Sequence, residues 1–420
     1  MSVAFEFTDL QEVSPIELSD YHEDLRKTLR KFATSVIRPV SVELDQMTPE
    51  EVIKKGSPFW STMKQMHGLG YHTIFLPEAY GGIGLDPLAL HMFFEEISFG
   101  SVGFGVAIGV DAFPTFFALM VAAERPELID EVIIPYAGDT DAKLTGCWAI
   151  TEPDRGSDIL TPGAPWFRNP KISHNLVGKR VDGGYVLNGQ KAAWVSCGTT
   201  ARQAALFFGT DKSKGMAGGA IAVVDLDQKG VTRGKPLNKI GQRDLPQGEI
   251  FFEDVFVPDS RIITDEEGYE DFTDVVLGVA NAIMAVIGLG GGRAAFEEAL
   301  AYSKERVQGG TLLCDHEAIQ VKLANMYINL EAARQITRNV LNYNLTSMPP
   351  RTELSMASKI YTTNTCYQVA HEAIQVFGGN GLSKEYLIEK LFRDLRATLI
   401  EDGSNDSLTI AVARKLIYGE

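Results

Sequence analysis

The chain has few cysteines and histidines, and neither residue type is arranged as a metal site. Its four cysteines, Cys147, Cys197, Cys314 and Cys366, lie far apart with no CxxC pair. This spacing argues against a zinc site and a disulfide scaffold, and it favours a reducing, cytoplasmic setting. The seven histidines show no ligand spacing, and neither HExxH nor GxSxG occurs. We therefore expect no metal, and hydrolase chemistry has no support.

Basic residues are scarce relative to acidic ones. Lys and Arg number 39 against 55 Asp and Glu, a formal net charge of -16, and no run of five basic residues occurs. An acidic surface repels a phosphate backbone, so we expect no nucleic-acid partner. No apolar run reaches ~18 residues without interruption, and the N-terminus lacks a basic stretch followed by an apolar core. We therefore expect neither a transmembrane helix nor a signal peptide.

What remains is a folded composition in 420 residues, of which 45% are hydrophobic and 22% charged. This length suggests two or three domains. The hydrophobic period changes twice, which predicts an α+β multidomain protein with a helical part, a β part and a second helical part, at 1–142, 143–264 and 265–420. The absence of βαβ alternation argues against a doubly wound sheet.

Local patterns fill in the three parts. The segment 25–40 carries a helical stripe that Pro39 should end, and 91–124 reads as one long buried helix. Short β-rich runs at 185–191, 204–210, 220–226 and 249–257 suggest an antiparallel barrel or sandwich. The polar stretch 161–184 before them looks like an insertion. Helical spacing returns at 293–306, 316–342 and 355–378.

A glycine-rich stretch at 286–315 resembles a dinucleotide fingerprint, because Gly288-x-Gly290 follows an apolar run and opens a helix. The sixth position is Arg293, however, and the residues that follow are helical. A glycine-lined helix crossing is the better interpretation.

Three other clusters carry candidate chemistry, and each has an ordinary structural explanation. In TGCWAITEPDRGSD (145–158) and NGQKAAWVS (188–196), tryptophans and hydroxyls suit an isoalloxazine ring but also a barrel core. The turn in QVFGGNG (375–381) could approach a pyrophosphate or simply cap a helix. In RDLRATLIEDGSNDS (393–407), Glu401 and Asp402 could supply a base or form a solvated turn.

Taken together and in this order, these motifs resemble the acyl-CoA dehydrogenase family. The matching stretches also include LPEAYGGIGL (76–85), IGQR (240–243), FEDVFVP (252–258), KERVQGG (304–310) and EKLFRD (389–394). The resemblance covers nearly the whole chain. It implies a helical N-terminal domain, a β middle domain, a C-terminal four-helix bundle, FAD as cofactor and a homotetramer.

The resemblance also implies roles for individual residues. The flavin would be lined by Trp148, Ile150, Thr151 and Ser157, with Ser157 also beside the substrate. Trp194 would flank the ring and Ser196 would face its N5. The pyrophosphate and adenosine would be held across a subunit interface by Arg306, Gln308, Gln375, Gly378 and Gly379. Ser404 and Asp406 would lie near the adenine end.

The family chemistry is α,β-dehydrogenation of a CoA thioester, in which a base removes the α proton and hydride passes to the flavin. Here Asp402 occupies the position of the family's Glu, with Glu401 before it as the rival base. The alternative base position of some members falls on Ala280 or Asn281, so that base is absent. Asp111 could supply a second carboxylate. Asn281 and Asp111 are thus further candidates for substrate contact.

An Asp carboxylate sits roughly 1.5 Å further back than a Glu carboxylate. Misplacement on this scale can cost ~10²-fold in rate unless the substrate sits differently. We therefore expect a bulky, cyclic or branched acyl group. Four glycines, Gly100, Gly103, Gly105 and Gly109, should free room for it, and the insertion 161–184 should shape the mouth of the site. Electrons would pass to an electron-transfer flavoprotein. A non-oxidising, lyase-like relative and a silent acyl-CoA-binding protein are the alternatives.

Overall fold

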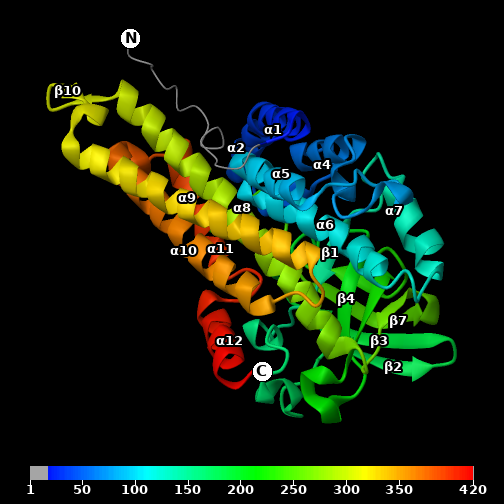
Figure 1. Cartoon of the computed structure of the whole chain (residues 1–420). Helices are drawn as coiled ribbons and strands as arrows, with labels where there is room; N and C mark the ends of the chain where they lie inside the picture. The colour runs from blue at the N-terminus through cyan, green and yellow to red at the C-terminus, as the bar shows by residue number, and fades with distance from the viewer. Residues whose placement is uncertain (1–17, 420) are drawn as a thin grey trace.

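The N-terminal part is a helical layer. The computed structural model describes residues 18–419, so the first seventeen residues of the predicted N-terminal domain lie outside the described residues. Seven helices, blue to cyan in Figure 1, make up this part: α1 (Asp20–Phe32), α2 (Arg38–Gln46), α3 (Pro49–Ile53), α4 (Pro58–Gly68), α5 (Pro87–Gly100), α6 (Val102–Met120) and α7 (Ile134–Ala137).

The expectation that Pro39 ends the first helix is wrong. A π-helical turn, η2 (Ala33–Ile37), joins α1 directly to α2, and Pro39 lies in the first turn of α2. A proline inside a helix has no N–H to donate and crowds the preceding turn. The wider π turn ahead of Pro39 accommodates it, because the Arg38 N–H reaches back to the Ala33 carbonyl.

The predicted long helix over 91–124 is two helices. Ser101 adopts an extended conformation between α5 and α6, and its side chain caps α6 by accepting from the Phe104 N–H. The Ser101 hydroxyl also donates to Asp244 of the middle domain at 2.5 Å. The break therefore comes from a cap that the long apolar pattern hides.

The middle part is one eight-stranded sheet with strand order β6-β7-β3-β2-β4-β5-β8, and β1 pairs with β4 off this path. Most pairs are antiparallel, as predicted, but β1 runs parallel to β4 and so does the short contact of β2 with β4. Four strands were not foreseen, namely β1, β2, β6 and β8. The strands are β1 (Gly146–Ala149), β2 (Val177–Val181), β3 (Gly184–Lys191), β4 (Gln203–Gly209), β5 (Gly219–Asp225), β6 (Val231–Arg233), β7 (Ile250–Pro258) and β8 (Ile262–Thr264).

The predicted insertion 161–184 is partly regular structure, because it contains β2. Its first half folds against the C-terminal part. Arg168 donates to the Glu270 carboxylate at 2.6 Å, and the Gly163 N–H donates to the same carboxylate at 2.9 Å. The Arg414 guanidinium lies 5.3 Å from the centre of the Trp166 ring. The segment is thus tied to the start of α8 and to α12.

The C-terminal part is the predicted four-helix bundle, formed by α8, α9, α10 and α11, with α12 beside it (yellow-green to red in Figure 1). A short hairpin of β9 (Val307–Gln308) and β10 (Thr311–Leu312) follows α8. The helices are α8 (Tyr269–Glu305), α9 (Glu317–Thr346), α10 (Thr352–Phe377), α11 (Leu387–Thr398) and α12 (Asn405–Tyr418).

Two helices, α6 and α8, are long and apolar enough to cross a membrane by length and composition. Their apolar windows are 89% and 94% buried inside the fold, respectively. One apolar core runs through all three parts, so these helices serve as its central elements.

Glycines in α8 allow neighbouring helices to approach closely. A Cβ on Gly290 would lie 2.4 Å from the Glu95 carbonyl oxygen of α5, and one on Gly292 would lie 2.6 Å from Cys366 of α10. The interpretation of 286–315 as a helix crossing is confirmed.

Candidate active site

The turn between α11 and α12 carries the two predicted acids. Asp402 has φ 53° and Gly403 has φ 100°, so the chain reverses sharply at a residue type that tolerates the left-handed region. The buried Lys359 of α10 holds this turn, because its ammonium donates to the Gly403 carbonyl and to the Asn405 Oδ1, both at 2.8 Å. The position of Asp402 is therefore fixed from a neighbouring helix.

The two adjacent acids have different surroundings. Glu401 accepts a hydrogen bond from the Gln242 side-chain amide at 2.8 Å. Within residues 18–419, no group hydrogen-bonds to the Asp402 carboxylate. Burial raises the pKa of Asp402 to about 7, with the Glu401 charge adding to this effect and Lys359 opposing it. Asp402 is thus a free carboxylate that can take up a proton near neutral pH.

A hydrogen bond links this turn to the β part. The Ser404 N–H donates to the Ser157 hydroxyl at 2.9 Å. Ile150 and Thr151 precede Ser157 in the chain by a few residues. The Ile150 carbonyl accepts from the Lys191 ammonium, and the Thr151 carbonyl accepts from the Ala192 N–H. Asp406 is exposed in the first turn of α12. The structure therefore brings predicted residues from two parts of the chain to one place.

The two tryptophans have different environments. Trp148 is buried, with its ring edge-on to Phe113 at 5.3 Å between centroids, so the core explanation holds for its side chain. Trp194 is 60% exposed, although it is large and apolar. Beside it, the Ser196 hydroxyl accepts from the Gln247 amide at 3.0 Å. An exposed aromatic face next to a hydroxyl is what a planar cofactor requires.

A second group of predicted cofactor residues lies at the other end of the bundle. Arg306 and Gln308 are exposed in the hairpin after α8. Tyr302 connects this end to the glycine turn, because its ring stacks on Phe377 at 4.0 Å and its hydroxyl accepts from the Asn380 amide at 2.8 Å. The turn and the exposed Gln375 are thereby placed beside the hairpin.

The glycine turn is open to an approaching group. Gly378 has φ 60° and ψ -137°, a conformation that requires glycine. Gly379 has no such constraint, and a Cβ there would meet nothing within 4 Å. Backbone N–H groups in such a turn can bind a phosphate.

The two groups do not form one site within one chain. From Lys359, which holds the Asp402 turn, to Phe377, which begins the glycine turn, α10 advances about 27 Å at 1.5 Å per residue. Figure 1 likewise shows the β10 hairpin at the end of the bundle far from the sheet. Within one chain, the two groups therefore lie far apart along α10.

The expectation that Asp111 contacts substrate is wrong. Its side chain is buried, and its two oxygens accept from His67 at 2.9 Å, from the Tyr136 hydroxyl at 2.8 Å and from the Gly146 N–H at 2.6 Å. Asp111 therefore joins the N-terminal helices to the start of β1. Its hydrogen-bonding capacity is used inside the protein.

The glycines of α5 and α6 do not free room for substrate, contrary to prediction. A Cβ on Gly103 would lie 2.3 Å from the Asp244 carboxylate, and one on Gly105 would lie 2.1 Å from the Ser98 hydroxyl. These positions are filled by neighbouring protein atoms. Asn281 is buried in α8, where its amide N–H donates to the Leu277 carbonyl and its Oδ1 has no partner in the described residues.

Comparison with known proteins identifies this architecture. Family models of the acyl-CoA dehydrogenase N-terminal, middle and C-terminal domains match residues 19–123, 147–255 and 267–417. The chain belongs to the acyl-CoA dehydrogenase family. It is accordingly a flavin-linked oxidoreductase with FAD as cofactor.

Among its relatives, the 3-(aryl)acrylate reductase of Clostridium sporogenes is 31% identical over 95% of this chain and 99% of its own. The benzylmalonyl-CoA dehydrogenase of Aromatoleum aromaticum is 29% identical over 95% of this chain and 99% of its own. The solved butyryl-CoA dehydrogenase of Megasphaera elsdenii is 25% identical, with a TM-score of 0.84 over 96% of this chain and all of its own.

The residues present fit FAD. The exposed Trp194, the Ser196 hydroxyl and the Ser157–Ser404 contact offer an aromatic wall and hydrogen-bonding groups, while the open Gly379 backbone and the exposed Arg306 suit a pyrophosphate. Within residues 18–419, no cluster of three or more potential metal ligands occurs.

Sequence reasoning missed Lys359, Gln242, Gln247 and also Lys239, whose ammonium donates to Gln247 Oε1. The IGQR motif contained Gln242, but its contact with Glu401 spans 159 positions. No sequence pattern distinguished Lys359 from other lysines on helical stripes.

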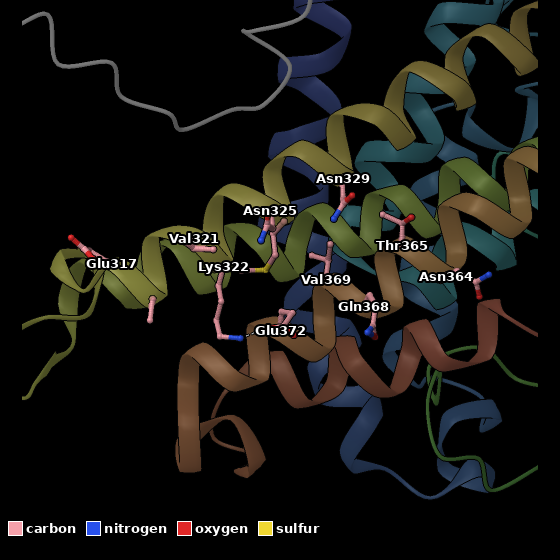
Figure 2. Close-up of a pocket in the computed structure, with 12 residues that line it drawn as sticks. Glu317, Val321, Lys322, Asn325, Asn329, Asn364, Thr365, Gln368, Val369 and Glu372 are labelled. Atoms are coloured by element: carbon pink, nitrogen blue, oxygen red, sulfur yellow. Dashed lines mark hydrogen bonds and ion pairs between the residues drawn. The ribbon is translucent and has the colours of Figure 1, made fainter.

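A groove that is separate from these residues lies between α9 and α10 (Figure 2). Its volume is about 840 Å³, and Asn325, Asn329 and Gln368 are among its lining residues. An ion pair between Lys322 and Glu372 crosses it. None of the predicted site residues lines this groove.

Proposed function

We propose that the protein dehydrogenates an acyl-CoA thioester with a bulky, cyclic, aryl-bearing or branched acyl group, with Asp402 as the base. The observation that carries the assignment of the base is the contrast between two neighbouring acids. Glu401 is bonded to Gln242, whereas the Asp402 carboxylate is free and has a pKa of about 7. A general base works best with a pKa near the working pH.

Each side chain of the proposed active site has its own role in the reaction. Asp402 takes the α proton, which the thioester carbonyl makes more acidic. Lys359 keeps the Asp402 turn in place through Gly403 and Asn405. Trp194 would cover one side of the flavin, and Ser196 would hydrogen-bond to it. Bound FAD supplies the acceptor for the β hydrogen as hydride.

The substrate class rests on two further arguments. The shorter Asp side chain favours a substrate whose reacting carbon lies closer to the protein. Two relatives that cover nearly the whole chain are named for substrates with an aryl group. The short-chain acyl-CoA dehydrogenase of Rattus norvegicus is also 29% identical, so relatedness alone does not decide the acyl chain. The 161–184 segment, tied to α8 and α12, would form part of the substrate entrance.

We further propose a homotetramer that passes electrons to an electron-transfer flavoprotein in the cytoplasm. Assembly is supported by the 27 Å of helix that separates the two cofactor groups. Exposed apolar side chains accompany the distal group, since Val307 and Leu382 are 56% and 77% exposed. The groove between α9 and α10 in Figure 2 belongs to the same bundle and offers a face for a second copy.

The decisive experiment is anaerobic bleaching of the bound flavin with a panel of CoA thioesters. We expect cyclohexanecarboxyl-CoA or 3-phenylpropionyl-CoA to bleach it faster than butyryl-CoA. The Asp402→Asn variant is the matched control, because it should keep the flavin colour and lose bleaching with every thioester. Faster bleaching by butyryl-CoA would overturn the bulky substrate, and bleaching of Asp402→Asn at the normal rate would overturn the base.

A further inference from the structure

Ser196 belongs to a chain of hydrogen bonds that begins at a half-buried lysine. The Lys239 ammonium donates to the Leu245 carbonyl and to Gln247 Oε1, both at 2.8 Å. The Gln247 amide nitrogen then donates to the Ser196 hydroxyl at 3.0 Å and to the Trp194 carbonyl at 3.2 Å. Three side chains therefore form one connected path that ends at the predicted flavin contact.

The direction of every bond in this path is determined. An ammonium group donates and does not accept, so the carbonyl oxygen of Gln247 must face Lys239. The amide NH₂ consequently faces Ser196, whose oxygen must accept. Burial lowers the pKa of Lys239 to about 8, with the charges of Glu401, Asp244 and Asp394 opposing this, so the lysine remains protonated at neutral pH.

With its oxygen accepting from Gln247, the Ser196 hydroxyl hydrogen must point elsewhere. Within the described residues, it donates to no other group. We propose that Lys239 and Gln247 are positioning residues that hold Ser196 as a hydrogen-bond donor toward the flavin and so favour the oxidised cofactor in the resting enzyme. This inference rests on the proposed placement of the flavin against Trp194 and Ser196.

The physical reason is a change in the hydrogen-bonding character of the flavin. The N5 nitrogen of the oxidised ring accepts a hydrogen bond, whereas the same nitrogen in the reduced ring carries a hydrogen and donates. A serine fixed as a donor satisfies the oxidised ring and is poorly matched to the reduced one. Bonds in series also polarise one another, which strengthens the final donor.

The Gln247→Glu variant reverses the path with little change of shape. A carboxylate accepts from Lys239 and from the Ser196 hydroxyl, so Ser196 turns its hydrogen away from the flavin. This reversal should favour the reduced flavin. The added negative charge acts in the opposite direction, because it disfavours electron uptake. The two effects are separated by making the same change in a Ser196→Ala background, where only the charge effect remains.

The readout is the flavin midpoint potential of the FAD-saturated enzyme, measured by dye equilibration. We expect Gln247→Glu to move the midpoint potential about 30 mV further in the positive direction when Ser196 is present than in the Ser196→Ala background. For a two-electron couple, this difference is about tenfold in the redox equilibrium. Gln247→Met removes the donor without adding charge. It should shift the redox equilibrium about threefold toward the reduced flavin with Ser196 present and leave it unchanged in the Ser196→Ala background.

Gln203→Glu is the matched control, since the Gln203 side-chain amide donates to the Leu144 carbonyl and, among the described residues, makes no hydrogen bond to Ser196. Its effect on the potential should be the same in both backgrounds. Equal effects of Gln247→Glu and of Gln247→Met in the two backgrounds would overturn the positioning role. If Gln247→Glu fails to retain FAD, the Gln247→Met pair decides alone. A wild-type protein that binds no FAD, or whose FAD no acyl-CoA reduces, would instead refute the proposed function.

Discussion

Replacing Asp402 with Asn should abolish turnover and stabilise the protein. The two side chains have nearly the same shape, so the exchange removes the ionisable group with little change in packing. In the native protein, burial raises the pKa of Asp402 from 3.8 to about 7. The folded protein must therefore bear an unfavourable charge above neutral pH, which the unfolded chain bears at no cost.

The size and the sign of this effect follow from linkage. A carboxyl group whose pKa is raised on folding binds more protons in the folded state between the two pKa values, so stability falls as pH rises through this window. At 1.36 kcal/mol per pKa unit, ionisation of Asp402 lowers the free energy of unfolding by about 2 kcal/mol at pH 5.5 and by about 4 kcal/mol above pH 7. The Asn variant should be more stable by these amounts.

Urea unfolding of the two FAD-saturated proteins at equal concentration measures the difference. We expect the advantage of the Asn variant to grow by about 2 kcal/mol between pH 5.5 and pH 8.5 and then to level off. Turnover of the wild-type enzyme should rise through the same window, since only ionised Asp402 can accept a proton. A stability difference that does not change with pH would refute a raised pKa of Asp402, and a fully active Asn variant would refute its role as base.

Three further changes test the surroundings of this site. Glu401→Gln should keep most of the turnover and shift the acidic limb of the pH profile to lower pH, because the Glu401 charge raises the pKa of Asp402; loss of activity here, with activity kept in Asp402→Asn, would reassign the base. Lys359→Met should shift the same limb to higher pH and slow turnover about tenfold, since it removes an opposing charge and the bonds that hold the turn; an unshifted pH profile would contradict this. Arg306→Gln should weaken FAD binding about 10- to 100-fold, because it removes a charged hydrogen bond, while light scattering should show an unchanged assembly. Unaltered FAD affinity, measured by fluorescence, would show that Arg306 does not bind the cofactor.

The sequence alone determined the order of a helical, a β and a second helical part, because hydrophobic periodicity is a local property of the chain. It also located the acidic turn before α12 and the Trp194–Ser196 stretch, since both lie within short motifs. It predicted correctly that the glycines of 286–315 line a helix crossing. It failed at Ser101, where a single helix cap divides the predicted helix in two, and at Pro39, where a π turn lets the helix continue past a proline.

Only the tertiary structure decided which acid is free. Glu401 and Asp402 are neighbours in the chain, and the difference between them comes from Gln242 and Lys359, which reach the turn from other parts of the fold. The pKa of a carboxyl group depends on burial and on nearby charges, and neither quantity is encoded in a local pattern. For the same reason, the sequence left open whether Asp111 faces the substrate, whereas its bonds to His67, Tyr136 and Gly146 settle that it does not.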